Sequence, residues 1–364
     1  MGYRRLEQAA RARGDSLDVV TPDRFPALDR WHARWRALFL PLVVAVWLWR
    51  RRRQYDVALF HSYTGWMFNL LPARLPTITA FHGVEPLAFE AFEAERRAQG
   101  LPRLSRRYRL VHGWMMRHVL QWTCRRSRRV TCLNAEERSY LLDRGWTTAD
   151  RLVVLHHGVT NEFFVDRRDY APRARRILWV AQWLELKGVH YLVEAFAALA
   201  REHADLELWC CGTRIPSEVV LRSFPEDVRN RVTVKAELRH DELSADLRAA
   251  DIFVHTALNE AYGRAIAEAM ASALPIVVTP VGVAIDLLQD GRDCLIVPKA
   301  DARALALAIG RLLDNVELRK KLGGGARRVA ATLTARERDA VVLDLLSEVV
   351  ADAGAHDERH GPVS

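Results

Sequence analysis

Two glutamates, Glu260 and Glu268, stand in the otherwise apolar stretch NEAYGRAIAEAMASALPIVVTP (residues 259–280). A buried carboxylate is costly unless it is paired or hydrogen-bonded, so each must reach water, a partner or a ligand. The run DIFVHTA before them predicts a buried parallel strand, and a helix is predicted from about residue 262 to residue 272. Glu260 then lies at the carboxyl end of a strand, where open sheets bind ligands. Helical geometry places Glu268 about 80° round from Glu260, so both can address one ligand.

The start of that helix adds a second chemical feature. Its first amides lack helical partners and favour an anion. A diphosphate held there would have a sugar on one side and a ribose on the other, with one glutamate available to each set of hydroxyls. The alternative is that both carboxylates are solvated or cap the helix.

Short apolar runs alternate with longer amphipathic segments along the chain, which predicts parallel strands joined by helices. The predicted strands of the first series are SLDVVTP, YDVALFHS, LPTITAFHG, RRVTCLN and DRLVVLHHG; those of the second are RILWVAQ, LELWCCG, RVTVKAE, DIFVHTA, LPIVVTP and DCLIVPK. A basic, proline-containing stretch at residues 160–174 separates the two series. We therefore predict an α/β protein with two Rossmann-like lobes, residues 1–165 and 170–335. A helix at 336–353 and a disordered tail at 354–364 follow.

The start of the chain departs from this pattern. GYRRLEQAARARG predicts a helix, whereas a doubly wound domain normally begins with a strand. We interpret this as the loss of the first strand and most of the first glycine-rich loop, through truncation or a misplaced start. A family variant with a rearranged sheet edge is the alternative.

The stretch from Asn259 onward resembles the carboxy-terminal signature of glycosyltransferase family 4, the retaining GT-B enzymes. The shared features are the two glutamates at this spacing, an aromatic–glycine pair (Tyr262–Gly263), the small-residue turn EAMA, and a later strand, glycine loop and DG turn. ILWVAQWLELKGVHYLVEAFAAL and VVLHHGV extend the resemblance, which covers the chain from the first helix to about residue 315. It implies the GT-B fold, with the donor nucleotide sugar on the second lobe and the acceptor on the first. It also implies that the carboxy-terminal helix packs back on the first lobe.

The resemblance assigns a role to each matched residue. Glu260 would bind the donor-sugar hydroxyls and Glu268 the ribose. Lys187 would contact the donor diphosphate, where a cation stabilises the leaving group. Tyr262, Gly263 and Gly282 would belong to the donor loops. For the charged residues, the alternative is a solvated side chain without a ligand.

Several positions differ from the family pattern. Gln182 stands where an arginine is usual; it can donate a hydrogen bond but carries no charge. We hypothesise that Arg264, in the first helical turn, replaces that guanidinium; an arginine that points to solvent is the alternative. Asp286 replaces the usual glutamate in the loop that begins at Gly282, and Val283 replaces its second glycine.

Two histidines mark the first lobe. By resemblance, His82 is the histidine near the reacting centre, and Gly83 allows close approach of the backbone. His61 ends the preceding predicted strand and is a second acceptor-side candidate. A loop histidine held only by packing is the alternative. The HHG sequence at residues 156–158 is interpreted as a loop and not as a metal site, because no third ligand is suggested.

Other motifs are missing from the sequence. There is no D-x-D, no P-loop and no G-x-G-x-x-G. We expect no metal and no cofactor, with helix amides and Lys187 carrying the diphosphate charge. The five cysteines have neither zinc nor disulfide spacing, and no signal peptide is recognised, which suits reduced thiols and a cytoplasmic location.

Basic residues are concentrated in the first third of the chain. Residues 1–130 hold 24 Arg, no Lys and 10 acidic residues, whereas the rest holds 30 basic and 35 acidic residues. RWHARWRALFLPLVVAVWLWRRRR has 13 consecutive apolar residues, fewer than the roughly 20 that span a bilayer. It is interpreted as a helix packed on its sheet or, alternatively, resting on an anionic membrane surface together with SRRYRLVHGWMMRHVLQWTCRRSRR. Nucleic acid fits the charge, but no motif supports it.

The resemblance therefore implies a retaining glycosyltransferase, which we expect to be metal-independent. It would move a sugar from a nucleotide-diphosphate sugar to a lipid-linked, polysaccharide or other envelope acceptor, in the cytoplasm and in peripheral contact with the inner face of the plasma membrane. Two alternatives remain: a catalytically weak or inactive nucleotide-sugar-binding protein, and a basic membrane- or nucleic-acid-binding adaptor.

Overall fold

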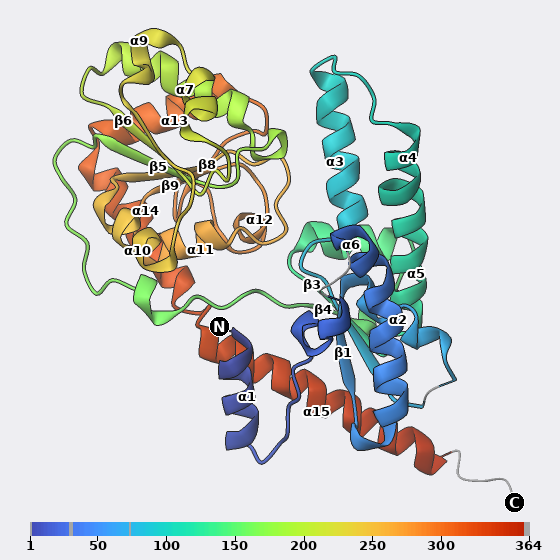
Figure 1. Ribbon diagram of the computed structural model, residues 1–364. Coiled ribbons are helices and arrows are strands. Elements are labelled where there is room, and N and C mark those ends of the chain that lie inside the picture. The colour runs from blue at the N-terminus through green and yellow to red at the C-terminus, as the bar shows by residue number, and fades with distance from the viewer. Residues whose placement is uncertain (1, 29–31, 73, 360–364) are drawn as a thin grey trace, which may run out of the picture. The chain divides into compact units, whose positions relative to one another are not determined.

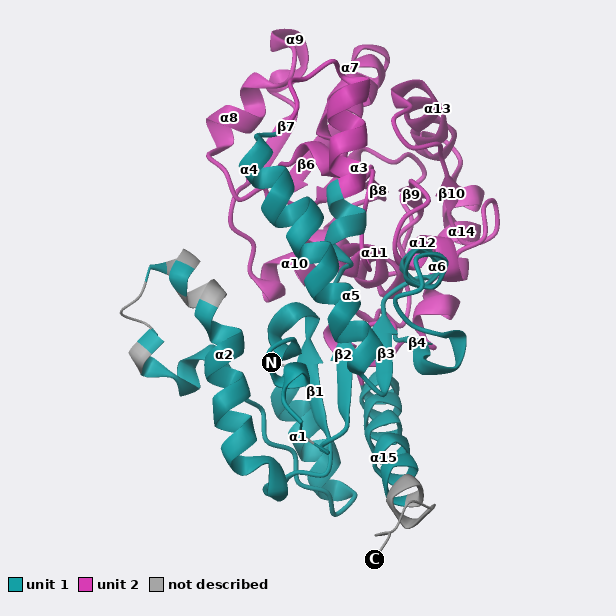
Figure 2. Cartoon of the chain, turned by 90° about the vertical axis from the view of Figure 1, so that its right-hand side faces the viewer, with its two compact units in different colours: residues 1–89, 104–155, 336–364 teal, residues 90–103, 156–335 magenta. Residues whose placement is uncertain are grey.

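The computed structural model describes residues 2–28, 32–72 and 74–359, and the chain divides into two compact units (Figures 1 and 2). Unit 1 consists of residues 1–89, 104–155 and 336–364, and unit 2 of residues 90–103 and 156–335. Each unit contains one sheet in which every described pair of strands is parallel. The predicted α/β class with two Rossmann-like lobes is confirmed.

The sheet of unit 1 has its strands in chain order. They are β1 (Ala58–His61), β2 (Thr77–Ala80), β3 (Arg129–Cys132) and β4 (Leu152–Val154). Ile78 and Val130 are fully buried, as expected for strands covered on both faces. The predicted strand SLDVVTP is wrong: residues 15–21 are irregular. Asp18 in this segment accepts hydrogen bonds from the side chains of Tyr55 and Arg24, and no strand pairing is formed by residues 15–21.

The helices of this unit are α1 (Gly2–Ala12), α2 (Ala33–Arg51), α4 (Arg106–Tyr108), α5 (Met116–Arg126), α6 (Ala135–Asp143) and α15 (Ala335–Arg359), with a π-helical segment η6 (Arg109–Met115) between α4 and α5. Helix α3 (Glu85–Ala98) begins in unit 1 and continues into residues of unit 2. The short 3-10 turns are η1 (Pro22–Arg24), η2 (Pro26–Leu28), η3 (Arg52–Gln54), η4 (Ser62–Gly65), η5 (Phe68–Leu70) and η7 (Ala149–Arg151). The helix predicted at the start of the chain is confirmed as α1.

The last helix belongs to unit 1 by its packing. Leu345 and Val349 of α15 form a buried cluster with Ile78 of the sheet. Leu6 packs against the same helix, and Arg5 pairs with the buried Asp339 at 2.5 Å. The helix continues to Arg359, so its predicted end at residue 353 is too early. Residues 360–364 of the predicted disordered tail lie outside the described residues.

The sheet of unit 2 has the strand order of a dinucleotide-binding fold. Along the sheet it runs β10-β9-β8-β5-β6-β7, so the first strand of this unit, β5, lies beside its fourth, β8. The strands are β5 (Arg176–Val180), β6 (Glu207–Cys211), β7 (Val232–Lys235), β8 (Ile252–His255), β9 (Ile276–Val278) and β10 (Leu295–Ile296). The order reverses between β5 and β8, and open sheets bind ligands at the carboxyl ends of such a pair.

Helices cover both faces of this second sheet (Figure 1). They are α7 (Val189–Glu202), α8 (Ser217–Arg222), α9 (Glu226–Arg229), α10 (His240–Ala249), α11 (Arg264–Ala271), α12 (Val283–Leu287), α13 (Ala302–Leu313) and α14 (Val316–Ala330), with 3-10 turns η8 (Asn161–Phe163) and η9 (Glu185–Lys187). The strands are therefore nearly continuous apolar runs, with Trp179, Phe253 and Val277 fully buried.

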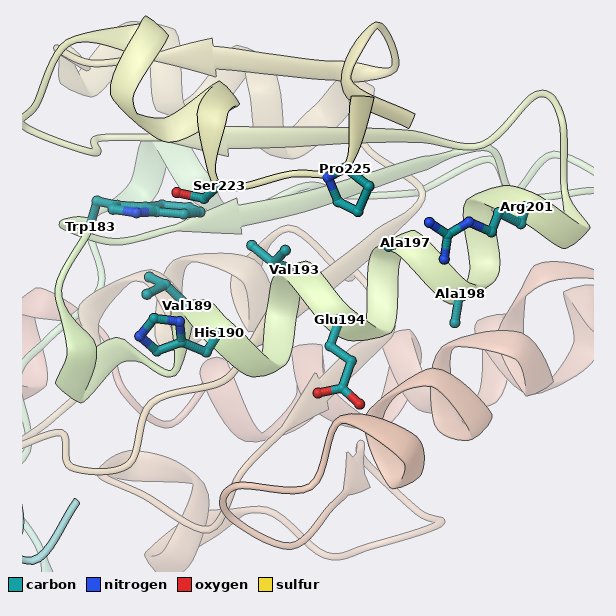
Figure 3. Close-up of a pocket in the computed structure, with 10 residues that line it drawn as sticks. All are labelled: Trp183, Val189, His190, Val193, Glu194, Ala197, Ala198, Arg201, Ser223 and Pro225. Atoms are coloured by element: carbon teal, nitrogen blue, oxygen red, sulfur yellow. The ribbon is translucent and has the colours of Figure 1, made fainter. Parts of the chain in front are cut away.

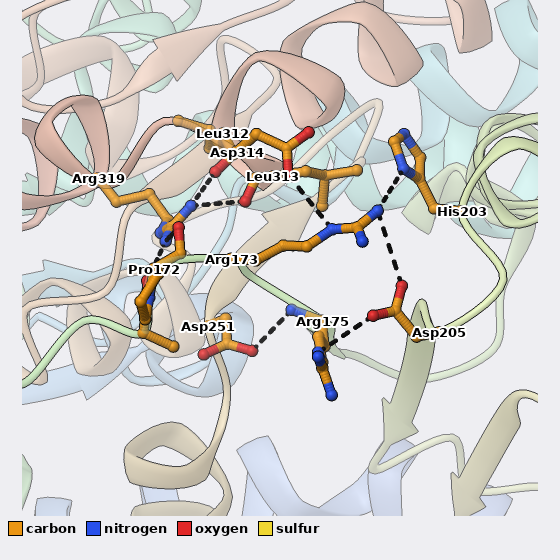
Figure 4. Close-up of polar contacts among 11 residues, drawn as sticks. Pro172, Arg173, Arg175, His203, Asp205, Asp251, Leu312, Leu313, Asp314 and Arg319 are labelled. Carbon is orange, nitrogen blue, oxygen red and sulfur yellow. Dashed lines mark hydrogen bonds and ion pairs between the residues drawn. The ribbon is translucent and has the colours of Figure 1, made fainter.

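The basic stretch that separates the two strand series is fixed to unit 2 (Figure 4). The buried guanidinium of Arg319 donates to the carbonyls of Leu313 at 2.8 Å and Pro172 at 3.1 Å, and also to those of Leu312 and Ala171. Because these carbonyls belong to the end of α13 and to the segment before β5, one side chain fixes where the second sheet begins.

Within the described residues, no helix is both long and apolar enough to cross a membrane. The apolar segment in the first third of the chain lies within helix α2. This helix contains a proline, the buried Pro41.

Candidate functional site

The switch point of the second sheet carries an ion pair between two predicted site residues. Lys187 lies in η9, in the loop after β5, and Glu260 lies in the loop after β8. Lys187 Nζ is 2.6 Å from Glu260 Oε2, and both side chains are about four-fifths buried, with exposed fractions of 20% and 19%. The tertiary fold thus unites residues that are far apart in the sequence.

The two loops are held together by more than this pair. The Leu258 amide donates to the Leu186 carbonyl at 2.8 Å, and the Thr256 hydroxyl donates to the Lys187 carbonyl at 2.7 Å. Gly188 has a φ of 66°, and a Cβ added there would lie 2.0 Å from the Thr256 carbonyl oxygen. Only glycine fits this contact, so the position of Lys187 is fixed by backbone packing.

His255, the last residue of β8, is a site residue that the sequence analysis missed. Its Nε2 is 3.3 Å from Glu260 Oε2, and its side chain is 2% exposed. The signal was available in the sequence, since a histidine near the end of the buried run DIFVHTA must lie at the ligand-binding edge of the sheet.

Burial alone would raise the pKa of Glu260. The nearby His255 and the charge of Lys187 outweigh that effect and lower the pKa to about 2. Glu260 is therefore ionised, and a fixed carboxylate at this position is able to accept hydrogen bonds from hydroxyl groups.

The aromatic–glycine pair shapes the start of α11. Gly263 caps the helix in a left-handed conformation, with a φ of 80°. Tyr262 is buried and donates its hydroxyl to the His157 carbonyl at 2.5 Å. Gly282 lies directly against Tyr262, where a Cβ would come within 2.4 Å of the Tyr262 carbonyl oxygen. These three residues join the start of α11 to the Gly282 loop and the 156–158 loop.

Glu268 lies inside α11, and only 9% of its side chain is exposed. Burial raises the pKa of Glu268 to about 7, although Arg264 acts in the opposite direction. Its carboxyl borders a small cavity of about 20 Å³, enough for one water molecule, whose other walls include Thr160, Tyr262 and Ala267. Glu268 thus has an environment opposite in character to that of Glu260.

Three residues that differ from the family pattern, Arg264, Gln182 and Asp286, lie in different elements of unit 2. Arg264 Nη2 lies 3.5 Å from Glu268 Oε1, while 71% of its side chain is exposed. Gln182 is exposed in the loop after β5. Asp286, in α12, pairs with His156 Nε2 at 2.9 Å, so the 156–158 loop is tied to α12 as well as to Tyr262.

The predicted residues of unit 1 form a second cluster. His61 ends β1 and His82 follows β2, and the two rings meet with His82 Nε2 2.7 Å from His61 Nδ1. Tyr3 of α1 approaches the other side of His61, with its hydroxyl 3.4 Å from Nε2. Burial, then His82, then Arg338 lower the pKa of His61 to about 4, and burial and Arg338 lower that of His82. Gly83 follows with a φ of 140°.

Two glutamates of unit 1, the half-buried Glu85 and the buried Glu137, were also missed. The Ser62 hydroxyl donates to Glu85, and burial raises the pKa of Glu85. Glu137 accepts from the amides of Leu133 at 2.8 Å and Val84 at 3.0 Å, yet burial still raises its pKa to about 7. Glu85 could have been identified from the sequence, because it closely follows His82 and Gly83 at the end of a predicted strand.

A larger cavity of about 540 Å³ contains none of the predicted site residues. It runs along α7, with the Trp183 ring beside Ser223 at one end and Arg201 at the other (Figure 3). Its walls are mainly apolar, including Val189, Val193 and Pro225, and it offers no counterpart to the Lys187–Glu260 pair.

Among residues 2–28, 32–72 and 74–359, no group of three or more His, Cys, Asp or Glu side chains could hold a metal ion. The five cysteines are all free and buried.

Both halves of the chain match models of glycosyltransferase families. Residues 3–163 match the family model described as Glycosyltransferase Family 4, and residues 174–315 match the one described as Glycosyl transferases group 1.

Relatives with a described activity match more than half of this chain, and two of them serve as examples. A D-inositol 3-phosphate glycosyltransferase of Corynebacterium glutamicum is 28% identical over 243 residues, which cover 62% of this chain and 58% of the relative. A lipopolysaccharide core biosynthesis glycosyltransferase of Rhizobium meliloti is 27% identical over 211 residues, 57% of this chain and 60% of the relative. The chain spans less than two thirds of these relatives.

Solved structures extend the likeness in fold. A sucrose-phosphate synthase from Thermosynechococcus elongatus has a TM-score of 0.70 at 20% identity, covering 86% of this chain and 78% of that one. The Anabaena protein HepE, solved with UDP-glucose, has a TM-score of 0.64 at 16% identity, covering 84% and 82%. The two parallel sheets and the likeness to these structures confirm the predicted two-lobed GT-B fold.

Proposed function

Since the chain belongs to glycosyltransferase family 4, with the GT-B fold, we propose that it transfers a sugar from a nucleotide-diphosphate donor, with retention at the anomeric carbon. The observation that carries this proposal is the buried cluster of Lys187, Glu260 and His255 at the switch point of the second sheet. It joins a cation suited to a diphosphate to a fixed carboxylate suited to sugar hydroxyls.

Each residue has a proposed role in donor binding. Lys187 and the first amides of α11 bind the diphosphate and stabilise the charge that develops on it as the glycosidic bond breaks. Glu260 orients the donor sugar, and His255 positions Glu260. Glu268 accepts from the ribose hydroxyls, with Gly263 and Gly282 allowing close approach of the backbone.

The acceptor is proposed to bind unit 1, near His82, Gly83 and His61. We propose a lipid-linked, polysaccharide or other envelope acceptor, a choice supported by the similarity to the Rhizobium meliloti core transferase. The leaving phosphate would assist deprotonation of the attacking hydroxyl, so the proposal names no protein base.

A donor panel tests the proposal directly. UDP-, GDP-, ADP- and CDP-sugars are each measured for thermal stabilisation and for donor hydrolysis. We expect one nucleotide series to stabilise the protein and to be hydrolysed slowly. The Glu260→Gln variant should lose hydrolysis while it keeps its fold by circular dichroism.

The two alternative functions give different results in the same panel. A nucleotide-sugar-binding protein without activity would be stabilised by a donor that it never hydrolyses, even with acceptors added. An adaptor would show no stabilisation by any nucleotide. Either result would contradict the proposed transferase activity.

A further inference from the structure

Exposed apolar side chains gather on one helical rod of unit 1. We define the α4–α5 rod as residues 106–126, in which α4, the π-helical segment η6 and α5 follow one another without a break. Trp114 is 60% exposed and Leu110 is 57% exposed, and Tyr108, Met115 and Trp122 are exposed as well. Large apolar groups on a surface mark an interaction site when several occur together.

The same rod is strongly basic. Between Glu95 and Glu136 the chain has 11 arginines and no acidic residue. Arg106 and Arg107 at the start of the rod, and Arg125 and Arg126 at its end, are exposed. Apolar and cationic groups therefore share one element, with no acidic side chain in that stretch to neutralise it.

Helix α2 repeats this combination. Ala45 and Leu48 are buried against Phe60 and Phe68, so one face of α2 forms part of the core. Residues on its other face are nevertheless apolar and exposed: Trp35, Leu42 and Val46. These positions fall on one side of a helix, because they are separated by seven and four residues. Arg50–Arg53 follow at its carboxyl end.

The two elements lie on the same side of unit 1. Figure 1 places α2 and the α4–α5 rod together beside the first sheet, and Figure 2 looks onto that side. Both pack against η4, the turn that directly follows His61. A partner bound by α2 and the rod would therefore lie on helices that support the acceptor-side strand end.

We propose that α2 and the α4–α5 rod dock unit 1 on the surface of an anionic lipid bilayer. The arginines would contact lipid headgroups, and Leu110, Trp114 and Leu42 would enter the boundary between headgroups and acyl chains. Exposed aliphatic side chains favour a bilayer over nucleic acid, whose backbone offers them no apolar contact. The inference that docking delivers the acceptor rests on the proposed function, whereas docking itself requires no donor.

Vesicle flotation of the full chain tests this proposal. We expect binding to vesicles that contain phosphatidylglycerol, little binding to phosphatidylcholine alone, and weaker binding as salt is raised. Leu110→Ser with Trp114→Ser, and separately Arg106→Glu with Arg107→Glu, should each lower the affinity by at least about tenfold. All four residues are exposed, so circular dichroism and Tm should be unchanged.

Matched controls come from unit 2. Leu307→Ser replaces a leucine that is 62% exposed on α13, and Arg222→Glu with Arg303→Glu makes the same change in charge at exposed positions. These controls should bind vesicles like the wild type. The proposal is overturned if the wild type ignores phosphatidylglycerol vesicles, if the unit 1 variants bind normally, or if single-stranded RNA or duplex DNA binds more tightly and displaces the vesicles.

The same proteins separate this proposal from the transferase activity. The Leu110→Ser, Trp114→Ser variant should keep the wild-type thermal response to soluble nucleotide sugars. If the wild type binds vesicles but shows no thermal response to any nucleotide sugar, the proposed function is contradicted and membrane docking is still supported.

Discussion

The carboxyl ends of the two parallel sheets hold polar groups of opposite electrostatic character. In unit 2, Glu260 is ionised with a pKa of about 2 and is paired with Lys187. In unit 1, burial lowers the pKa of His61 to about 4 and raises the pKa of Glu137 to about 7. Burial dominates in the first sheet, whereas specific partners overcome it in the second.

Under the proposed function, this difference would let one architecture serve two kinds of ligand. Fixed, paired charges suit a diphosphate, which must be held and stabilised as it leaves. Neutral histidines, together with carboxyl groups whose pKa is raised, suit the hydroxyl groups of an acceptor, which hydrogen bonds can orient without net charge. Glu268 shows that unit 2 contains both environments, since its pKa of about 7 resembles that of Glu137.

The largest effect should come from the paired carboxylate. Glu260→Gln removes the charge that Lys187 and His255 surround, and we expect donor turnover to fall by at least about 100-fold. Initial rates of donor hydrolysis measure this, with the exposed Glu218→Gln as the control for loss of one acidic residue. Activity close to the wild type would show that the ion pair serves the fold alone.

A second prediction contrasts the two glutamates of unit 2 through stability. The folded pKa of Glu260, about 2, lies below its ordinary value of 4.5, so its contribution is present above pH 4.5 and is lost as the pH falls toward 2. The folded pKa of Glu268, about 7, lies above 4.5, so ionisation at that site destabilises the fold as the pH rises from 4.5 to 7.

The two substitutions to glutamine should therefore shift stability in opposite directions. At pH 8, we expect Glu260→Gln to lower the free energy of unfolding and Glu268→Gln to raise it, each on the order of 2 kcal/mol. Urea titrations at pH 5 and pH 8 provide the measurement. Shifts of the same sign at pH 8 would remove the contrast between these sites.

A smaller effect is expected from the histidine pair of unit 1. The folded pKa of His61, about 4, lies below 6.5, so folding stability is lost as the pH falls from 6.5 to 4. His61→Gln should reduce that loss by about 1–2 kcal/mol. Urea titrations between pH 4 and pH 6.5 measure this loss, with His190→Gln, at an exposed position, as the control. If the wild type and both variants show the same pH dependence of stability, the prediction of a neutral His61 is contradicted.

The smallest effect concerns Arg264. Its side chain is mostly exposed and lies 3.5 Å from Glu268, so we expect Arg264→Ala to weaken donor binding by about two- to fivefold. Calorimetric Kd values and donor-hydrolysis rates measure the effect, with Lys187→Ala as the large-effect reference. If both quantities remain unchanged, the hypothesis that Arg264 replaces the missing guanidinium fails.

Much of the architecture was predictable from local pattern. Apolar runs such as RILWVAQ and LPIVVTP, short and placed between amphipathic segments, favour buried strands, and strands β5 and β9 form within them. SLDVVTP also contains a short apolar run but forms no strand, because pairing depends on a neighbouring ladder that a short run cannot specify by itself.

The sequence by itself determined the strand–helix alternation, the glycines at tight turns and the spacing of Glu260 and Glu268, because these depend on neighbours along the chain. Only the tertiary structure decided which groups meet. Strand order brings Lys187 and His255 to Glu260, and burial sets Glu268 and His61 far from their ordinary pKa values. Ionisation depends on distance and solvation in space, and residue spacing alone specifies neither.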